Sequence, residues 1–378
     1  MLNLEYDRLA ALLHSVFELQ AEEKDLTIIL DLPGGKILDT PAWRDRRRIA
    51  TEWYVQLQVH RKELPFRGIN LCAYENVGSN NADLPERLTL VDCAPASLSL
   101  LQDGKISIHD LLSSTSVILA PTELSATAPL KVLAKKYGFR GATLPGFLRE
   151  MIPALGLDYQ KIDARVREIK ERMDRAVSAS LVLVAGKQIF ELSLDLRFRS
   201  GHASGGLMKD PGVVANLPSG EAYIVPYEGE RAGEPSKSAG FLPVQFGGEL
   251  VVFAVENNRC IEVKTSGPES ARQRLKIADE PAYGNIAELG LGVLSEWGVK
   301  AVGSTLLDEK LGLHIAFGRS EHFGGVTSPT SFRNPENVIH IDWVYVAATQ
   351  PGIAVKSLLF SYPDGGSEEI MKNGNLVI

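Results

Sequence analysis

Cysteine is scarce in this chain, because only Cys72, Cys93 and Cys260 occur among 378 residues and they form no C-x-x-C pair. Their spacing argues against a disulfide framework and a cysteine zinc site. Apolar runs long enough to span a bilayer are also missing. Near the start, Glu5 and Asp7 stand where a signal peptide would be apolar. We therefore expect a cytoplasmic protein with no membrane partner.

A surplus of positive charge is absent as well. The chain has 40 basic and 47 acidic residues, a formal net charge of -7, and these charges are spread along its length. This charge pattern does not indicate a basic surface for binding nucleic acid. The length and the 44% apolar content predict a large core and two domains. A peptide or another small molecule remains open as the partner.

Residues 1–178 have the pattern of an α/β domain with a mostly parallel sheet, because apolar stretches of strand length alternate with periodic segments of helix length. The expected strands are Thr27–Leu32, Ile69–Tyr74, Ser116–Ala120 and Gly141–Leu144, and the expected helices are Glu5–Glu23, Pro41–Arg61, Ala126–Tyr137 and Tyr159–Val177. Residues 179–378 instead contain β-rich runs between Gly and Pro, as in Leu181–Ala185, Gln188–Leu196 and Glu249–Val255. We predict a strand-rich α+β C-terminal domain there, which binds metal and carries the catalytic site.

Among the seven histidines, His314 and His340 lie in segments that also supply carboxylates. In a strand, side chains two residues apart project to the same face, so His340 and Asp342 are expected to point together. Glu309 and His314 are five residues apart and need a turn at Gly312 to converge. Imidazole with carboxylate suits a divalent metal such as zinc. Each segment alone also fits an ordinary strand or a solvated turn.

Two further glutamates stand in notable surroundings. Glu221 follows a Pro-Ser-Gly turn at the start of an expected strand, where it could face a cleft or simply be solvated. Glu288 lies in the apolar, glycine-rich run Ile-Ala-Glu-Leu-Gly-Leu-Gly. A carboxylate there must be exposed, paired or bound to metal, since burying it bare is costly.

Taken together, these four segments resemble in order, wording and approximate spacing the motifs of the thermophilic (leucyl) metallo-aminopeptidase family. That family carries a Pro-x-Gly-Glu motif, Ile-Ala-Glu-x-Gly-x-Gly, Asp-Glu-Lys followed by His-Ile-Ala-x-Gly, and a late His-x-Asp. The resemblance implies a homodimer with a two-metal site that uses zinc or cobalt. The implied ligands are Glu221, Glu288, Glu309, His314, His340 and Asp342, with Glu288 bridging the ions. In a two-metal hydrolase a nearby glutamate can carry the proton to the leaving amine, and Glu288 or Glu309 is our candidate for that role.

One position departs from the family pattern. The family places a catalytic tyrosine seven residues after the histidine that matches His314, and Glu321 stands there in this chain. Tyr345, Tyr283 or His322 could take the part of this tyrosine. Peptidase activity is put in doubt by this change, whereas metal binding is not.

Three functions therefore compete. The preferred hypothesis is an aminopeptidase-like hydrolase, which removes N-terminal amino acids from peptides, or cleaves a small amide, with a metal-activated water. The rival is a mononuclear iron(II) ring-cleaving enzyme resembling 2,5-dihydroxypyridine dioxygenase, in which His314, His340 and Asp342 would form the facial triad. The three glutamates argue against a single iron, and the absent tyrosine argues mildly for it. A metal-binding protein without catalysis is the third.

Overall fold

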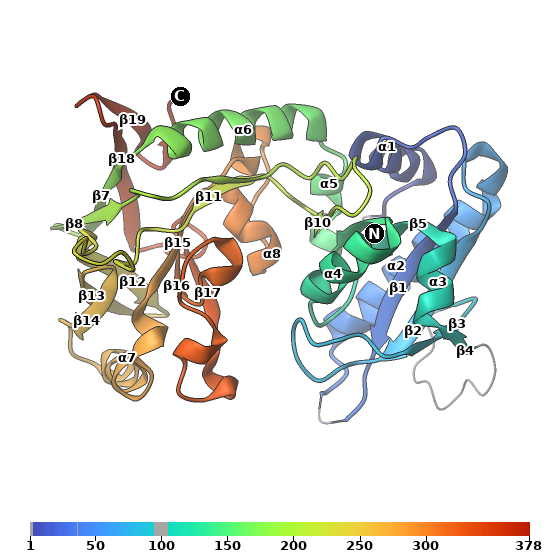
Figure 1. The fold of residues 1–378 in the computed structure, drawn as a ribbon, viewed down its shortest axis with the longest axis horizontal. Coiled ribbons are helices and arrows are strands. Elements are labelled where there is room, and N and C mark those ends of the chain that lie inside the picture. The colour runs from blue at the N-terminus through green and yellow to red at the C-terminus, as the bar shows by residue number, and fades with distance from the viewer. Residues whose placement is uncertain (1–2, 36, 94–104) are drawn as a thin grey trace. The chain divides into compact units, whose positions relative to one another are not determined.

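The computed structural model describes residues 3–35, 37–93 and 105–378 (Figure 1). Contacts group them into two compact units, which we call the first and the second unit. The first contains the residues up to Asp163 together with Gly206–Ser219, and the second contains Ala164–Gly205 and Gly220–Ile378. The division falls inside helix α6 (Tyr159–Arg175). The predicted domain boundary at residue 178 stays a prediction.

The first unit is built on a seven-stranded sheet in the order β10-β6-β5-β1-β2-β3-β4. The pairs from β10 to β2 are parallel, and β3 and β4 add antiparallel edge pairs. This mostly parallel sheet confirms the predicted α/β class. Its strands are β1 (Asp25–Leu32), β2 (Ile69–Glu75), β3 (Arg87–Leu90), β4 (Lys105–Ser107), β5 (Thr115–Ala120), β6 (Arg140–Thr143) and β10 (Val214–Asn216).

Strand β1 is buried on both faces, as a continuous apolar run in a parallel sheet should be. On one face, Ile29 packs with Leu112 of α3 and Leu130 of α4. Helix α2 contacts β1 and β2; Pro41 is its first residue, and the Thr40 hydroxyl accepts the Trp43 amide hydrogen. The helices are α1 (Tyr6–Phe17), α2 (Pro41–Val59), α3 (Ile108–Ser114), α4 (Thr127–Tyr137) and α5 (Ile152–Leu155).

Helix α1 is shorter than the predicted helix Glu5–Glu23. It ends at Phe17, the last residue of its buried face, and Glu18 adopts a left-handed φ of 48°. The Glu18 amide still bonds to the His14 carbonyl, which closes the final turn. Apart from Leu19 and Ala21, residues 18–24 are polar or charged, so the large apolar side chains of the buried face do not continue beyond this point.

The second unit contains two sheets (Figure 1). The eight-stranded sheet has the order β14-β13-β12-β8-β7-β18-β19-β20, and the five-stranded sheet has the order β17-β16-β15-β11-β9. The larger sheet comprises β7 (Ser178–Ala185), β8 (Gln188–Asp195), β12 (Ala239–Phe246), β13 (Glu249–Glu256), β14 (Arg259–Val263), β18 (Ile353–Ser361), β19 (Ser367–Lys372) and β20 (Asn375–Leu376). The smaller comprises β9 (His202–Ser204), β11 (Glu221–Ile224), β15 (Ile286–Gly292), β16 (Leu313–Gly318) and β17 (His340–Val344). Helices α7 (Pro268–Asp279) and α8 (Thr305–Asp308) and most of α6 also belong to the unit. This strand-rich α+β unit confirms the fold class predicted for the C-terminal part.

Aromatic side chains join the two sheets of the second unit. Phe317 of β16 packs edge-on against Phe253 of β13, with ring centroids 5.1 Å apart. Trp343 of β17 packs against Phe246 of β12 at 4.9 Å. The face of the five-stranded sheet that carries Phe317 and Trp343 is therefore the core face, and its opposite face is free to carry polar groups.

Among the described residues, no helix has both the length and the apolar character needed to cross a membrane.

Candidate metal centre

The polar face of the five-stranded sheet follows directly from residue alternation. In β15, Glu288, Gly290 and Gly292 share one face, while the leucines between them point to the core. Pairing places Gly290 beside His314 of β16, and Glu288 beside Ala316. The next pairs set Ala316 beside Asp342 and Gly318 beside His340 in β17, and Gly292 beside Glu221 in β11. We call this surface the ligand face.

Small residues on the ligand face make room for the large polar ones. A methyl group on Gly290 would lie 1.9 Å from Nε2 of His314. A methyl group on Gly292 would lie 2.1 Å from the carbonyl carbon of Lys310, so the short 3-10 helix Glu309–Leu311 passes directly over this glycine. The glycines of the motif are therefore explained by close approach of a ligand and of the backbone.

Glu288 lies at the centre of the constellation. One of its carboxylate oxygens is 3.1 Å from Nε2 of His314, and the other is 3.3 Å from Nε2 of His340. Two groups of ligand atoms result, each with all atoms within 4.8 Å of one another: Glu221, Glu288 and His314, and Glu288, His340 and Asp342. Glu288 belongs to both groups, which is the geometry a bridging carboxylate requires.

Both imidazoles are oriented by backbone carbonyls. Nδ1 of His340 lies 2.8 Å from the Arg319 carbonyl, to which it donates. Nδ1 of His314 faces the Gly312 carbonyl at 3.4 Å. Donation from Nδ1 leaves Nε2 of each ring directed at the carboxylates, the arrangement seen for histidine ligands of metals.

The structure brings five of the six predicted ligands into these two groups, and Glu309 stands beside them. Glu309 contacts the ammonium of Lys310, whose Nζ is also 2.6 Å from Glu221. The predicted turn at Gly312 is wrong, since this residue is extended with φ -178°. The 3-10 helix Glu309–Leu311 changes the chain direction instead.

Burial and charge shift the pKa values of the cluster. Burial alone would lower the pKa of His314, but Glu288, Glu221 and Asp342 raise it to about 9. Burial would raise the pKa of Glu288, yet hydrogen bonds from His314 and His340 hold it below its usual range. Burial raises the pKa of Glu309 to about 8 against the opposing charge of Lys310. The cluster thus carries an excess of negative charge that imidazolium protons offset.

The donor set fits a divalent cation. Oε2 of Glu221 is buried and has no hydrogen-bond partner, although His314 Nε2 lies 3.5 Å away. A buried carboxylate oxygen without a donor is costly, and a cation would satisfy it. Because metal bonds to such ligands are about 2 Å long, groups of this size need only small shifts to bind an ion. The part of the chain described by the structure therefore contains a possible divalent-metal site of acidic residues and histidine.

Metal affinity is expected to rise with pH up to about 9. The pKa of His314 is raised from 6.5 to about 9 in the metal-free protein, and its proton must leave before Nε2 can bind a metal. The same shift stabilises the metal-free fold fully below pH 6.5, and this contribution is lost as the pH rises through 9. Zinc affinity measured by chelator competition across this range checks the prediction, and a flat profile would contradict it.

Replacing Gly290 by alanine is expected to weaken zinc binding by at least about tenfold, because the new methyl group displaces His314. The matched control is Gly248→Ala, since a methyl group on Gly248 meets nothing within 4 Å. Calorimetric titration of both variants measures the effect. Equal affinities would show that His314 is not a ligand.

The position of the family's tyrosine is occupied by a salt-bridged glutamate. Glu321 pairs with Arg319 on its own segment. The Tyr345 hydroxyl donates to the Pro243 carbonyl at 2.8 Å, and the Tyr283 hydroxyl donates to Gln273 at 2.7 Å, so both phenols are engaged in the core. The ring of His322 lies 5.3 Å from that of His340. Of the three predicted substitutes, His322 is the one that adjoins a ligand.

Sequence reasoning gave no role to two residues that the structure places in the cluster. Lys310 is 2% exposed and bridges Glu221 and Glu309. Tyr223 shares the ligand face with Glu221, and burial, followed by the charges of Glu288 and Glu221, raises its phenol pKa. Strand alternation could have found Tyr223, because it lies two residues after Glu221. Nothing in the sequence marks Lys310 as buried.

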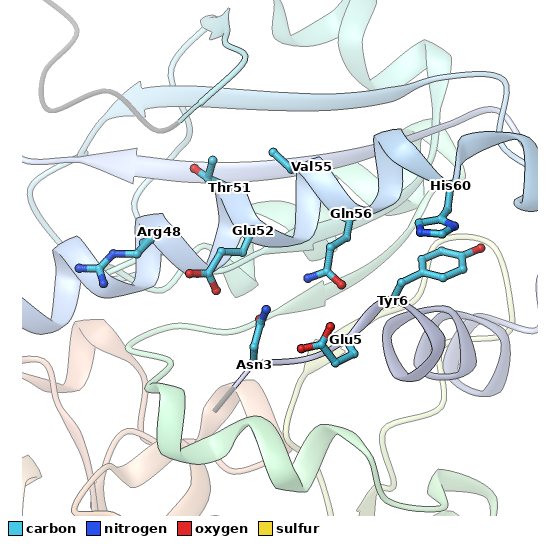
Figure 2. A pocket seen from close by; sticks show the side chains of 9 residues that line it. All are labelled: Asn3, Glu5, Tyr6, Arg48, Thr51, Glu52, Val55, Gln56 and His60. Carbon is cyan, nitrogen blue, oxygen red and sulfur yellow. The ribbon is translucent and has the colours of Figure 1, made fainter. Parts of the chain in front are cut away.

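The first unit has a hollow of about 500 Å³ between α2 and the N-terminal residues (Figure 2). Its lining includes Glu5, Arg48, Glu52 and His60. Neither group of candidate metal ligands draws on these residues. The candidate centre is therefore a feature of the second unit.

The fold is therefore mixed α/β, and its second unit carries a possible metal site of carboxylates and histidines. No family model and no curated protein sequence matches the chain. Solved structures do. One is 2,5-dihydroxypyridine dioxygenase from Pseudomonas putida KT2440, with a TM-score of 0.59, 14% identity, and coverage of 99% of this chain and 98% of that one. Another is wild-type AmpT from Thermus thermophilus, with a TM-score of 0.56, 14% identity, and 99% coverage of both chains. At such identity the likeness shows a shared fold.

Proposed function

We propose that this chain is a metal-dependent hydrolase that removes N-terminal amino acids from peptides or cleaves a related small amide. The observation that carries the proposal is the pair of ligand groups that share Glu288. A single bridging carboxylate between two sets of ligands suits two ions, for which we propose zinc or cobalt. The structural likeness to AmpT, a thermophilic aminopeptidase, and the motif resemblance agree with it.

Two bound ions would supply a water of lowered pKa and polarise the scissile carbonyl. Residues of the chain would then hold the ions and transfer the proton. Glu288 is held ionised by His314 and His340, so it serves as a ligand and does not carry a proton. Glu309, with a pKa raised to about 8, can hold a proton near neutral pH and pass it to the leaving amine.

Tyr223 is our candidate for the missing family tyrosine. Its ring packs against those of His202, with centroids 5.0 Å apart, and Phe323 at 4.7 Å, on the strand face that carries Glu221. A phenol in this place can donate a hydrogen bond to an oxyanion at the centre. We expect Tyr223→Phe to lower kcat by about a hundredfold. Bound metal, measured by elemental analysis, should stay at the wild-type level, and unchanged kcat would remove Tyr223 from the mechanism.

The second candidate is an iron(II) ring-cleaving dioxygenase. His314, His340 and Asp342 are all present on the ligand face, and the dioxygenase neighbour has a TM-score similar to that of AmpT. Glu321 in place of the tyrosine favours this candidate, whereas the buried carboxylates Glu221 and Glu288 favour the hydrolase.

One paired assay separates the two candidates. The metal-free protein is loaded with zinc, cobalt or iron(II), then offered aminoacyl p-nitroanilides and, under air, 2,5-dihydroxypyridine. We expect cleavage of the free-amine anilides, and no cleavage of N-acetylated controls, which lack the amine that the ions would hold. Oxygen consumption that requires 2,5-dihydroxypyridine and occurs only in the iron(II)-loaded protein would establish the dioxygenase. The homodimer implied by the resemblance stays a proposal that light scattering can check.

A further inference from the structure

A buried ammonium lies inside the carboxylate cluster. Lys310 is 2% exposed, and its Nζ is 2.6 Å from Oε1 of Glu221 while also contacting Glu309. The backbone of Lys310 is fixed above Gly292, where even a methyl group would clash. The position of this positive charge is therefore set by the fold.

The two ligand groups differ in charge, because the carboxylate of only one of them is already paired with a lysine among the described residues. One carboxylate oxygen of Glu221 forms an ion pair with Lys310. Glu221 belongs to the ligand group that contains His314. In the described part of the chain, the ion pairs of Glu288 and Asp342 come from histidines only. A histidine proton can leave when a metal binds, but a lysine 2.6 Å from the Glu221 carboxylate keeps its charge.

This inference rests on the two-metal centre of the proposed function. We propose that Lys310 competes with one of the two ions for the Glu221 carboxylate. The ion held by Glu288, His340 and Asp342 binds first and tightly. The ion held by Glu221, Glu288 and His314 binds second and weakly, because Lys310 already neutralises Glu221 and repels an incoming dication. Occupancy of the second position then follows the free metal concentration. The charge of Lys310 sets the concentration at which this position fills.

Zinc titration of metal-stripped, full-length protein tests this inference through binding alone. Wild type is expected to bind in two steps whose affinities differ by about a hundredfold or more. Lys310→Met keeps the length of the side chain and removes its charge, so the weaker step should tighten on the order of a hundredfold while the tighter step changes little. Lys310→Arg keeps the charge and should retain the weak step. Lys264→Met removes an exposed lysine paired with Glu262 and should match wild type.

Each outcome decides the matter. If Lys310→Met leaves both zinc affinities unchanged, whether the two sites are equal or unequal, the role of Lys310 is overturned and the two-metal hydrolase still stands. No zinc binding by any variant would overturn the proposed centre as well. If circular dichroism shows that metal-free Lys310→Met does not fold, the wild-type isotherm decides alone, because a single affinity for two ions contradicts the competition.

Discussion

Glu288→Gln is expected to abolish stable metal binding and, with it, metal-dependent activity. Glu288 is the residue common to both ligand groups, and it contacts His314 and His340 through different oxygens. Glutamine keeps the shape of the side chain but removes the charge and turns one oxygen into a donor. The loss should exceed the roughly 100-fold that follows when a residue merely orienting a ligand is removed.

Elemental analysis after dialysis against zinc measures this effect, alongside anilide cleavage. The matched control is Glu262→Gln, which changes an exposed carboxylate of the same unit and should keep both metal and activity. If Glu288→Gln still held two ions, the bridging role would be wrong.

Phe317→Ala is expected to lower the free energy of unfolding by about 3 to 5 kcal/mol, since it opens a cavity in a packed core. Phe317 is fully buried and packs against Phe253, Trp343 and Tyr283. It lies in β16 three residues after His314, on the opposite face of the strand. The ligand face should therefore lose its support together with the core.

Urea unfolding of the metal-free variant gives the change in free energy, and zinc titration reports the ligand face. Phe241→Ala serves as control, because Phe241 is 43% exposed and its removal should cost little. A loss below about 1 kcal/mol for Phe317→Ala would mean that the core has repacked and that the two sheets depend less on this ring.

Much of the ligand face could be predicted from the sequence, because successive side chains in a strand point to opposite faces of the sheet. The alternation in residues 288–292, 313–318 and 340–343 separates polar or small residues from large apolar ones. This alternation predicted that His340 and Asp342 point together, and the structure places their side chains 3.5 Å apart. The predicted helices and strands of the first unit also match observed elements, apart from their ends.

Other features depend on contacts that sequence periodicity does not encode. Gly312 was expected to turn, but the preceding 3-10 helix performs that change of direction. Strand β10 joins the parallel sheet of the first unit at Gly141–Thr143 after a long excursion of the chain, and no local pattern predicts this return. The burial of Lys310 follows from the passage of its backbone over Gly292, which only the paired strands reveal.

The choice between hydrolase and dioxygenase depends on how the acidic residues are used. A single iron bound by His314, His340 and Asp342 would leave Glu221 and Glu288 as buried carboxylates that need another partner. Lys310 pairs with Glu221, but among the described residues the ion pairs of Glu288 come only from the two histidines, which the iron would already bind. This charge accounting favours two cations over one.

The most direct test is the metal content of the purified chain after equilibration with excess zinc, cobalt or iron(II) and removal of unbound ions, with His340→Ala in parallel. We predict close to two zinc or cobalt ions per chain, and a loss of the tightly bound ion in His340→Ala. One iron per chain, with no second ion under any condition, would contradict the two-metal hydrolase in favour of the dioxygenase, and no bound metal at all would contradict both.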